Sequence, residues 1–370
     1  MILGIDVSTL NETRAVGLRY FVDGKEVEPV SYIHDNNGVS IMRLRLWIDP
    51  YDEAGRPYGG GTVDLDGFIK IAKEGLEKGY QILLDFHYSD FWCDPGKQFI
   101  PKAWAGLDID ELAEKVYEYT AKTLKTLQNE GIYPYGVQIG NEITNGTLWP
   151  LAKLTPNPEG GKRLGYPNLI KVLRKGVQAT REVSPNSLIV IHLERSGDQH
   201  TYKEYFDELT EAKLDFDVIG ISFYPYWHGT FDMVFSNVDM LKERYKKPVW
   251  IVETSYGFTT LPSTNQLETF TPLINSDLLS LDNIYAPFPL TPEGQLQFTT
   301  ELLAKAKEHG VDAVMWWEPF WLPKKGLTWA TVEGETYTHE TDKPTNNEWA
   351  NQCLFDYEGN ALPSLFAFHV

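Results

Sequence analysis

The sequence lacks the features that would assign it to a membrane or to a nucleic acid. No apolar run approaches the ~20 residues of a membrane-spanning helix, so we predict a protein that does not span a membrane. Positive charge is also in short supply: 33 lysines and arginines stand against 52 aspartates and glutamates, a net charge of −19. This excess argues against nucleic acid or an anionic lipid surface as a partner, whereas a neutral polymer is compatible with it.

Cysteine is scarce, and the start of the chain carries no export signal. Cys93 and Cys353 are the two cysteines among 370 residues, and they show no metal-ligand spacing. They could form a disulfide, but two thiols do not define a redox compartment. Residues 1–6 are already typical of a strand, so the chain could be a trimmed one, and the missing signal argues only weakly for the cytoplasm.

Strand-like and helix-like segments alternate along the whole chain. We predict strands at residues 2–6, 40–46, 81–87, 137–139, 188–192, 217–222, 248–253 and 312–317. We predict helices at residues 64–78, 110–128, 167–183, 231–245 and 291–309. This alternation predicts a (β/α)₈ TIM barrel that occupies residues 1–370 as a single domain. Long loops after the seventh and eighth strands, at residues 257–289 and 324–349, would wall a groove suited to an extended substrate.

Two of the predicted strands lead into a glutamate. Strand 137–139 gives way to Asn141 and Glu142, and strand 248–253 ends at Glu253. In a barrel both strand ends open on the same face, where such folds build their sites. Two facing carboxyl groups suit glycoside hydrolysis, in which one protonates the leaving oxygen and the other attacks the sugar or activates water. One such glutamate alone could equally be a solvated strand end, but two in register favour a site.

Two arginines share one face of the second strand, because strand side chains alternate with a period of two. Arg43 and Arg45 would therefore point into the barrel and need anionic partners, for which Asp6 and Glu253 are candidates. Arg45 lies nearer the functional end of the strand. A purely structural network of ion pairs is the alternative interpretation.

Histidines and aromatic residues also gather at strand ends. His87 ends an apolar strand and precedes a polar and aromatic loop, which favours a role in the site over a structural one. His192 ends the fifth strand in the same way. The chain holds 11 tryptophans and 20 tyrosines, and those beside strand ends could stack on sugars, although core packing accounts for most of them.

Five segments together resemble glycoside hydrolase family 53, the endo-β-1,4-galactanases. They are residues 84–98 (LDFHYSDFWCDPGKQ), 138–146 (QIGNEITNG), 249–256 (VWIVETSY), 316–319 (WWEP) and 351–365 (NQCLFDYEGNALPSL), and the resemblance covers nearly the whole chain. It implies internal, retaining hydrolysis of β-1,4-galactosidic bonds in galactan or type I arabinogalactan, the side chains of pectin.

The resemblance also implies roles for individual residues. Glu142 would be the acid/base and Glu253 the nucleophile, while Asn141 would hold the 2-hydroxyl of the substrate. Tyr224 would hydrogen-bond the nucleophile, and Trp317 would be the sugar platform at the cleaved unit. Four further residues match positions that line the family's site: Asp6, Arg45, His87 and His192. Burial beside a like charge would keep Glu142 partly neutral, and a nearby arginine and the tyrosine would keep Glu253 ionised.

The sequence departs from some bacterial members of that family, which bind calcium with an aspartate-rich run after the seventh strand. Residues 259–266 read TTLPSTNQ and contain no carboxylate. We therefore expect no required metal or cofactor. Calcium could still bind elsewhere, since Asp277, Asp282, Glu340 and Asp342 could supply carboxylates.

The expected partner is β-1,4-galactan, acted on by a monomer. Members of the family are usually exported, which implies a secreted, periplasmic or cell-surface location. Two alternatives stay open: another β-1,4-glycanase on the same barrel, such as a mannanase or xylanase, and a carbohydrate-binding barrel that has lost catalysis.

Overall fold

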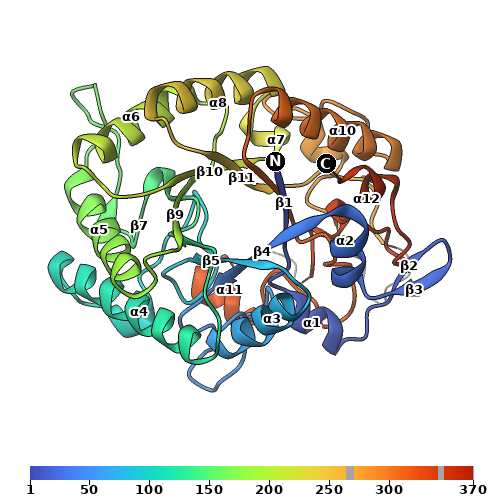
Figure 1. Ribbon diagram of the computed structural model, residues 1–370, viewed down its shortest axis with the longest axis horizontal. Helices are drawn as coiled ribbons and strands as arrows, with labels where there is room; N and C mark the ends of the chain where they lie inside the picture. Colours follow the sequence, from blue (N-terminus) through green and yellow to red (C-terminus); the bar gives the residue numbers. More distant parts are fainter. Residues whose placement is uncertain (264–270, 341–345, 370) are drawn as a thin grey trace.

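Eight parallel strands close into a barrel in the computed structural model, which describes residues 1–263, 271–340 and 346–369 (Figure 1). The strands are β1 (Ile2–Asp6), β4 (Val39–Leu46), β5 (Gln81–Phe86), β6 (Gly136–Ile139), β9 (Leu188–Leu193), β10 (Val218–Phe223), β11 (Val249–Thr254) and β12 (Ala313–Trp317). Their order around the barrel is β1-β12-β11-β10-β9-β6-β5-β4. All eight predicted strands are confirmed, each with ends within one residue of those expected.

Helices surround the strands and cover their outer face (Figure 1). They are α1 (Leu10–Ala15), α2 (Pro29–Asn37), α3 (Leu65–Glu77), α4 (Ile109–Asn129), α5 (Tyr166–Val183), α6 (Gln199–Glu211), α8 (Phe231–Tyr245) and α10 (Pro292–Glu308). Local sequence sets several of their starts: Asp108 and Glu111 form a capping box at α4, and Thr230 caps α8. The single-domain TIM barrel predicted from the alternation is confirmed.

Helix α6 was not predicted, although its signal is present in the sequence. Asp198 accepts a hydrogen bond from the backbone of Thr201 and caps the helix. The buried residues recur at the spacing of one helical face: Tyr202, Tyr205, Phe206 and Leu209. Three aromatic residues in this short segment obscured the pattern, because aromatic side chains have only moderate helix propensity.

Two layers of side chains fill the barrel, one apolar and one charged. Ile41, Leu83, Val190 and Trp250 belong to a buried apolar cluster inside the amino-terminal half of the barrel. One side-chain repeat further along β4, Arg43 begins the polar layer, and Arg45 continues it toward the carboxyl-terminal mouth. The apolar cluster thus forms a floor on which the charged groups of the site rest.

Short strands and helices lie between the barrel elements and after the last strand. They are β2 (Tyr20–Val22), β3 (Lys25–Val27), β7 (Gly146–Thr147), β8 (Ala152–Lys153), α7 (Pro225–His228), α9 (Ser276–Leu279), α11 (Val332–Thr338) and α12 (Pro363–Ala367). Residues 351–355 tie the two long loops together, since Asn351 donates to the carbonyl of Ile274 and Leu354 donates to that of Pro319. Within the part of the chain that is described, no helix combines the length and apolar character needed to cross a bilayer.

Candidate active site

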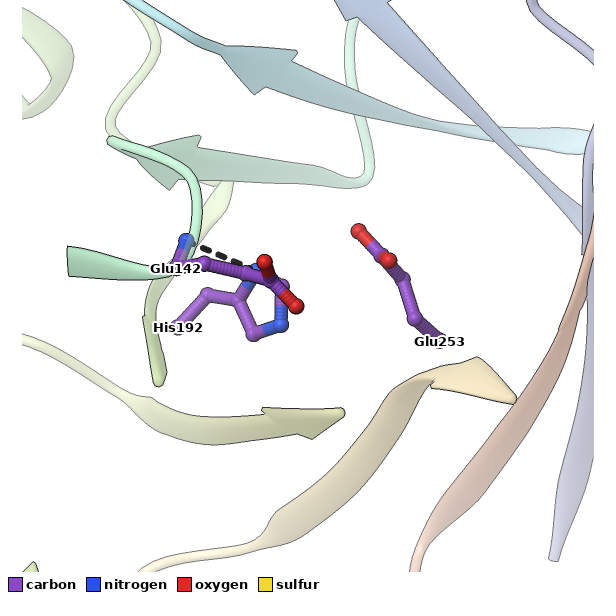
Figure 2. Close-up of side chains that lie close together, drawn as sticks. All are labelled: Glu142, His192 and Glu253. Atoms are coloured by element: carbon purple, nitrogen blue, oxygen red, sulfur yellow. Dashed lines mark hydrogen bonds between the residues drawn. The ribbon is translucent and has the colours of Figure 1, made fainter. Parts of the chain in front are cut away.

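Glu142 and Glu253 face each other across the carboxyl-terminal mouth of the barrel (Figure 2). Glu253 is the last residue but one of β11. Glu142 follows β6 after the turn at Gly140 and Asn141. A carboxylate oxygen of Glu142 and one of Glu253 lie within 4.8 Å of each other. The two residues singled out from their strand ends therefore do come together in one site.

The backbone at Glu142 adopts the left-handed conformation, with φ of 49°. A non-glycine residue held in this region costs on the order of 1–3 kcal/mol. Gly146, four residues later, has φ of 83°, and a Cβ there would lie 2.1 Å from the carbonyl oxygen of Ala152. A side chain at position 146 would therefore disrupt the loop that holds Glu142 in place.

The carboxylate of Glu253 is buried between a cation and a phenol. Arg43 Nη1 lies 2.8 Å from its Oε1, and the Tyr224 hydroxyl donates a hydrogen bond of 3.1 Å to its Oε2. Both groups favour the ionised carboxylate, although burial works against it. Burial raises the pKa of Glu253 to about 7, while the charge of Arg43 lowers it.

Arg43 is the central cation of the site. Besides Glu253, its guanidinium pairs with Asp6 and Asp85 at 2.8 Å each, and it donates to Oδ1 of Asn141. Burial disfavours its charge, but these three carboxylates outweigh burial and raise the pKa of Arg43. Arg43 therefore stays ionised and holds the carboxylates around it together.

Arg45 does not contact Glu253, one of the two anionic partners considered for the inward-facing arginines. Arg45 Nη1 pairs instead with Glu318 at 2.6 Å and lies 3.7 Å from Asp6. Its guanidinium stacks over Trp92, 4.3 Å from the ring centroid. The reason is geometric: Arg45 lies one side-chain repeat further along β4, level with the residue that follows β12 rather than with β11.

Glu142 is held by a chain of hydrogen bonds from β9 and β10. Ser222 Oγ lies 2.6 Å from Oε1 of Glu142, and His192 Nε2 lies 2.8 Å from that same hydroxyl. The other ring nitrogen of His192 lies 3.0 Å from Oδ1 of Asn141 and 3.4 Å from the backbone nitrogen of Glu142 (Figure 2).

This chain suits the ionised form of Glu142. Ser222 donates to the carboxylate and receives a hydrogen bond from Nε2–H of His192. Nδ1 of His192 then accepts the hydrogen bond that the backbone N–H of Glu142 donates. Burial and the charge of Arg43 hold the pKa of His192 well below its usual value, so its ring stays neutral.

The pKa of Glu142 lies well above its usual value. Burial is the largest cause, and the charges of Glu253 and Glu194 add to it, while the hydrogen bond with Ser222 opposes them. Among the described residues, no cation pairs with Glu142 as Arg43 pairs with Glu253. The pair is therefore asymmetric: Glu142 retains a proton more strongly, and Glu253 loses one first.

Glu142, His192 and Glu253 could also be considered as metal ligands, since each brings a ligand atom within 4.8 Å of the others. The guanidinium of Arg43 already lies 2.8 Å from Glu253, where it would repel a metal cation. Both nitrogens of His192 are engaged with Ser222 and Asn141. These residues fit a pair of reacting carboxyl groups better than a metal centre.

His87 lines the site, but both of its ring nitrogens have protein partners. Nδ1 accepts hydrogen bonds from the indole of Trp47 and the backbone of Cys93, both at 3.1 Å, and Nε2 lies 3.2 Å from Asp85. Burial lowers the pKa of His87, although the charge of Asp85 opposes this. Its contacts orient Asp85 and the loop after β5, which leaves little capacity to bind a substrate directly.

A cavity of about 480 Å³ opens above the two glutamates. Trp317, at the end of β12, forms part of its wall and is 6% exposed. Trp349 meets Trp317 edge-on at 4.9 Å, and Trp92 stacks flat on Trp329 at 4.2 Å. The loop after β12 thus contributes two of four indoles to an aromatic wall beside the carboxyl pair, which is the lining expected of a sugar-binding cleft.

Residues 2–368 match the family model described as glycosyl hydrolase family 53. The chain belongs to glycosyl hydrolase family 53. This finding confirms the resemblance read from the five sequence segments.

Curated and solved family 53 proteins align over nearly their full length. The chain is 31% identical to the "Endo-beta-1,4-galactanase" of Bacillus subtilis (strain 168), over 99% of this chain and 85% of that protein. It is 32% identical to the "Arabinogalactan endo-beta-1,4-galactanase" of Cellvibrio japonicus (strain Ueda107), over 99% and 90%. The solved family 53 catalytic domain of Ignisphaera aggregans is 38% identical, with a TM-score of 0.86 and coverage of 99% and 95%.

Several residues of this family 53 site were not singled out from the sequence. Ser222 ends the sixth predicted strand, Glu194 lies two residues after His192, and Glu318 directly follows Trp317. Arg43 was assigned to the inward face but not to the site. Their positions near strand ends, or on the inward face of a strand, could have identified all four as candidates. Only the closed barrel shows which of them contact Glu142 or Glu253.

Proposed function

We propose that this family 53 hydrolase cleaves internal β-1,4-galactosidic bonds of galactan or type I arabinogalactan by retaining double displacement. The observation that supports it best is the approach of Glu142 and Glu253 within 4.8 Å, measured between carboxylate oxygens. Retaining enzymes keep the two carboxyl groups about 5–5.5 Å apart, whereas inverting enzymes need roughly 6.5–9.5 Å to admit a water molecule.

In the first step Glu142 acts as the acid and Glu253 as the nucleophile. Oε1 or Oε2 of Glu253 attacks the anomeric carbon while Glu142 gives its proton to the leaving glycosidic oxygen. Arg43 and Tyr224 favour the ionised form of the attacking carboxylate and orient it. The raised pKa of Glu142 supplies the proton at a pH where an exposed glutamate would have lost it.

In the second step Glu142 acts as a base, because Glu253 has lost its negative charge. The ester bond to the sugar removes the negative charge of Glu253, which is one of the causes that raise the pKa of Glu142. Glu142 therefore releases its proton more readily and can take a proton from the incoming water. Ser222, which His192 orients through Nε2, donates a hydrogen bond to the ionised form.

The choice of galactan is supported by the shape of the cleft and by the family 53 relatives, which include an endo-β-1,4-galactanase and an arabinogalactan endo-β-1,4-galactanase. An open cavity walled by Trp317, Trp329 and Trp349 suits a polymer that lies across the barrel mouth. A β-1,4-mannanase or xylanase would use the same carboxyl pair, so the pair alone does not select the sugar. A binding protein without catalysis is disfavoured, because both carboxyl groups and their partners are in place.

Reducing-end assays on galactan, arabinogalactan, mannan and xylan test the substrate. We expect rapid release of internal fragments from galactan and arabinogalactan and not from mannan or xylan, and preferential hydrolysis of mannan or xylan would overturn the galactanase assignment. Proton NMR of the earliest products tests the mechanism. The β-anomer should appear first, and initial release of the α-anomer would make this an inverting enzyme.

We also propose that the protein acts outside the cytoplasm, in a secreted, periplasmic or cell-surface form. A long polysaccharide does not cross a lipid bilayer, so its first cleavage must take place where the polymer is found. Fractionation of the native host, with activity measured in the medium and in the cell extract, tests this location. We expect a monomer there, which sedimentation of the purified protein can test.

A further inference from the structure

A hollow of about 470 Å³ lies at the amino-terminal end of the barrel, on the face opposite the catalytic cleft. Residues at the starts of three neighbouring strands line it: Tyr80 and Gln81 at β5, residues 133–135 at β6 and residues 184–187 at β9. The carboxyl-terminal ends of α3 and α4 complete its wall. Its volume falls within the range of about 300–1,000 Å³ that is typical of ligand pockets.

Among the described residues that line this hollow, none carries a charge. Charge is frequent elsewhere, since charged residues make up 23% of the chain and its net charge is −19. The lining is built mainly from tyrosines, prolines, serines and the amides of Gln81, Gln128 and Asn186. Rings can pack against the carbon–hydrogen face of a sugar, and amides both donate to and accept from hydroxyl groups. The lining therefore favours a neutral, hydroxyl-rich ligand over an anionic one.

Three side chains of the hollow are available to such a ligand. Tyr133 is 67% exposed, which makes its ring the most exposed aromatic ring among the described lining residues. Gln81 and Asn186 are also exposed, and neither side chain makes a hydrogen bond within the described part of the chain. One ring and two amides can thus meet a sugar without breaking a contact inside the protein.

The backbone of the hollow is held in place by the barrel. The amide of Leu188 donates to the carbonyl of Tyr135 at 3.0 Å, and the hydroxyl of Ser187 donates to the carbonyl of Pro134 at 2.5 Å. The ring of Tyr135 stacks on Trp250, which belongs to the apolar floor of the barrel, with an angle of 4° between the ring planes. A ligand therefore meets preformed walls, and little free energy is lost in ordering them.

A polysaccharide suits this hollow better than a second protein does. Stable protein interfaces bury about 800 Å² on each partner and have an apolar centre. Here the exposed ring of Tyr133 is flanked by the amides of Gln81 and Asn186 in a concave site. A single ring with polar neighbours is typical of a site that holds one or two sugar units.

We propose that the hollow lined by Gln81, Tyr133 and Asn186 binds a neutral β-1,4-linked galactan chain at a second, non-catalytic site that keeps the enzyme on its polymer. The choice of galactan rests on the function proposed above, whereas the preference for a neutral polymer rests on the lining of the hollow itself. The hollow and the catalytic cleft open at opposite ends of the barrel, so a short oligosaccharide bound in the cleft does not reach the hollow.

Retardation in native gels that contain polysaccharide tests the site directly. The background is Glu253→Ala combined with Trp317→Ala, which leaves the polymer intact and weakens its binding in the cleft. Adding Tyr133→Ala to this background should lower the apparent affinity for linear β-1,4-galactan by roughly twofold to tenfold, as expected for the loss of one aromatic contact. Polygalacturonate, an anionic polymer, should retard neither protein. Equal retardation by polygalacturonate and galactan would contradict the assignment.

Rates on long and short substrates test whether the hollow keeps the enzyme on its polymer. With Tyr133→Ala as the single change, the initial rate on dilute galactan should fall by roughly twofold to tenfold. The kcat/KM on galactotetraose should stay at the wild-type value, because a tetrasaccharide in the cleft does not extend to the hollow. Equal losses on both substrates would place the effect in the cleft and overturn the proposal.

Matched variants separate a sugar contact from a general effect on the fold. Tyr133→Phe keeps the ring and should keep most of the retardation, whereas Gln81→Ala should weaken it. Phe366 in α12 is 46% exposed and does not line the hollow, so Phe366→Ala should change neither retardation nor rate. Unfolding midpoints of all these variants should stay close to that of the wild type, since the side chains are exposed.

Failure of this inference and failure of the proposed function have different signatures. If the wild type releases no fragments from galactan, or prefers mannan or xylan, the proposed function itself fails. If the wild type cleaves galactan but Tyr133→Ala leaves retardation by galactan unchanged, the assignment of the hollow is wrong. Sedimentation gives a further check: a wild-type dimer that Tyr133→Ala converts to a monomer would make the hollow an interface between two copies and overturn the proposal.

Discussion

Arg43 Nη1 lies 2.8 Å from Oε1 of Glu253, and this contact joins the second barrel strand in sequence to the seventh across the barrel interior. The same guanidinium pairs with Asp6 and Asp85, so a single side chain contacts three buried carboxylates. Removing a partner from a buried ion pair costs about 3–5 kcal/mol, because the remaining charge is left uncompensated. A change at Arg43 should therefore affect both the stability of the protein and the charge of Glu253.

Arg43→Met should move the acidic limb of the pH–activity profile to higher pH. The charge of Arg43 lowers the pKa of Glu253, so its loss raises that pKa, and a higher pH is then needed to ionise the nucleophile. Arg45→Met is the matched control, because Arg45 pairs with Glu318 instead. It should destabilise the protein by a similar amount and leave the acidic limb in place. Equal shifts in both variants would contradict the assignment.

Replacing the two glutamates should have different consequences. Glu253→Ala should abolish hydrolysis of every substrate, since no covalent intermediate can form. Glu142→Ala should lose roughly 10²–10⁴-fold on galactan, but much less in the first step on an aryl galactoside whose leaving group needs no proton. Added azide should then restore turnover of Glu142→Ala and yield the β-glycosyl azide. Formation of the α-azide by Glu142→Ala would contradict these roles.

Two neighbours of Glu142 should shift the basic limb of the profile in opposite directions. Glu194 raises the pKa of Glu142 by its charge, so Glu194→Gln should lower that pKa and move the basic limb to lower pH. Ser222 lowers the same pKa through its hydrogen bond, so Ser222→Ala should move the limb to higher pH. Burial raises the pKa of Glu194 to about 6, so its effect should fade below that pH. Shifts of the same sign would refute this account.

Trp317→Ala should damage turnover more than stability. The ring lines the catalytic cavity, and removing it takes away the surface proposed for the sugar at the cleaved bond. Turnover on galactan should fall by an order of magnitude or more, since an aromatic contact contributes about 0.5–1.5 kcal/mol beyond the area that it buries. Trp316→Ala is a useful contrast, because Trp316 is buried against the C-terminal segment and should mainly lower the unfolding midpoint. Near-normal turnover by Trp317→Ala would remove this residue from the site.

Chelation should leave both activity and thermal stability unchanged. Residues 259–263 contain no carboxylate, and residues 264–266 of the same loop lie outside the described part of the chain. Of the other carboxylates considered, Glu340 pairs with Lys97 at 3.3 Å, and Asp342 lies outside the described residues. Differential scanning calorimetry with and without EDTA tests the prediction. A large drop in the unfolding midpoint on chelation would reveal a calcium site.

From the sequence alone we could predict the barrel and the two glutamates that face each other at its mouth. Eight apolar segments, each bounded by polar residues, predicted the strands to within one residue of their ends. They were recognisable because a parallel strand that is buried on both faces has an uninterrupted apolar sequence. Glu142 and Glu253 were identified for the same reason, since each ends such a run. Helix α6 was missed because its buried face is mostly aromatic.

The pairing of arginines with carboxylates became apparent only in the folded barrel. Arg43 and Arg45 are the same type of residue and lie two positions apart on one face of the same strand. Arg45 was preferred as a site residue because it lies nearer the mouth of the barrel. The tilt and stagger of the strands in the closed barrel bring Arg43 level with Glu253 and Arg45 level with Glu318. That register depends on contacts between strands far apart in the chain, so no local pattern of residues encodes it.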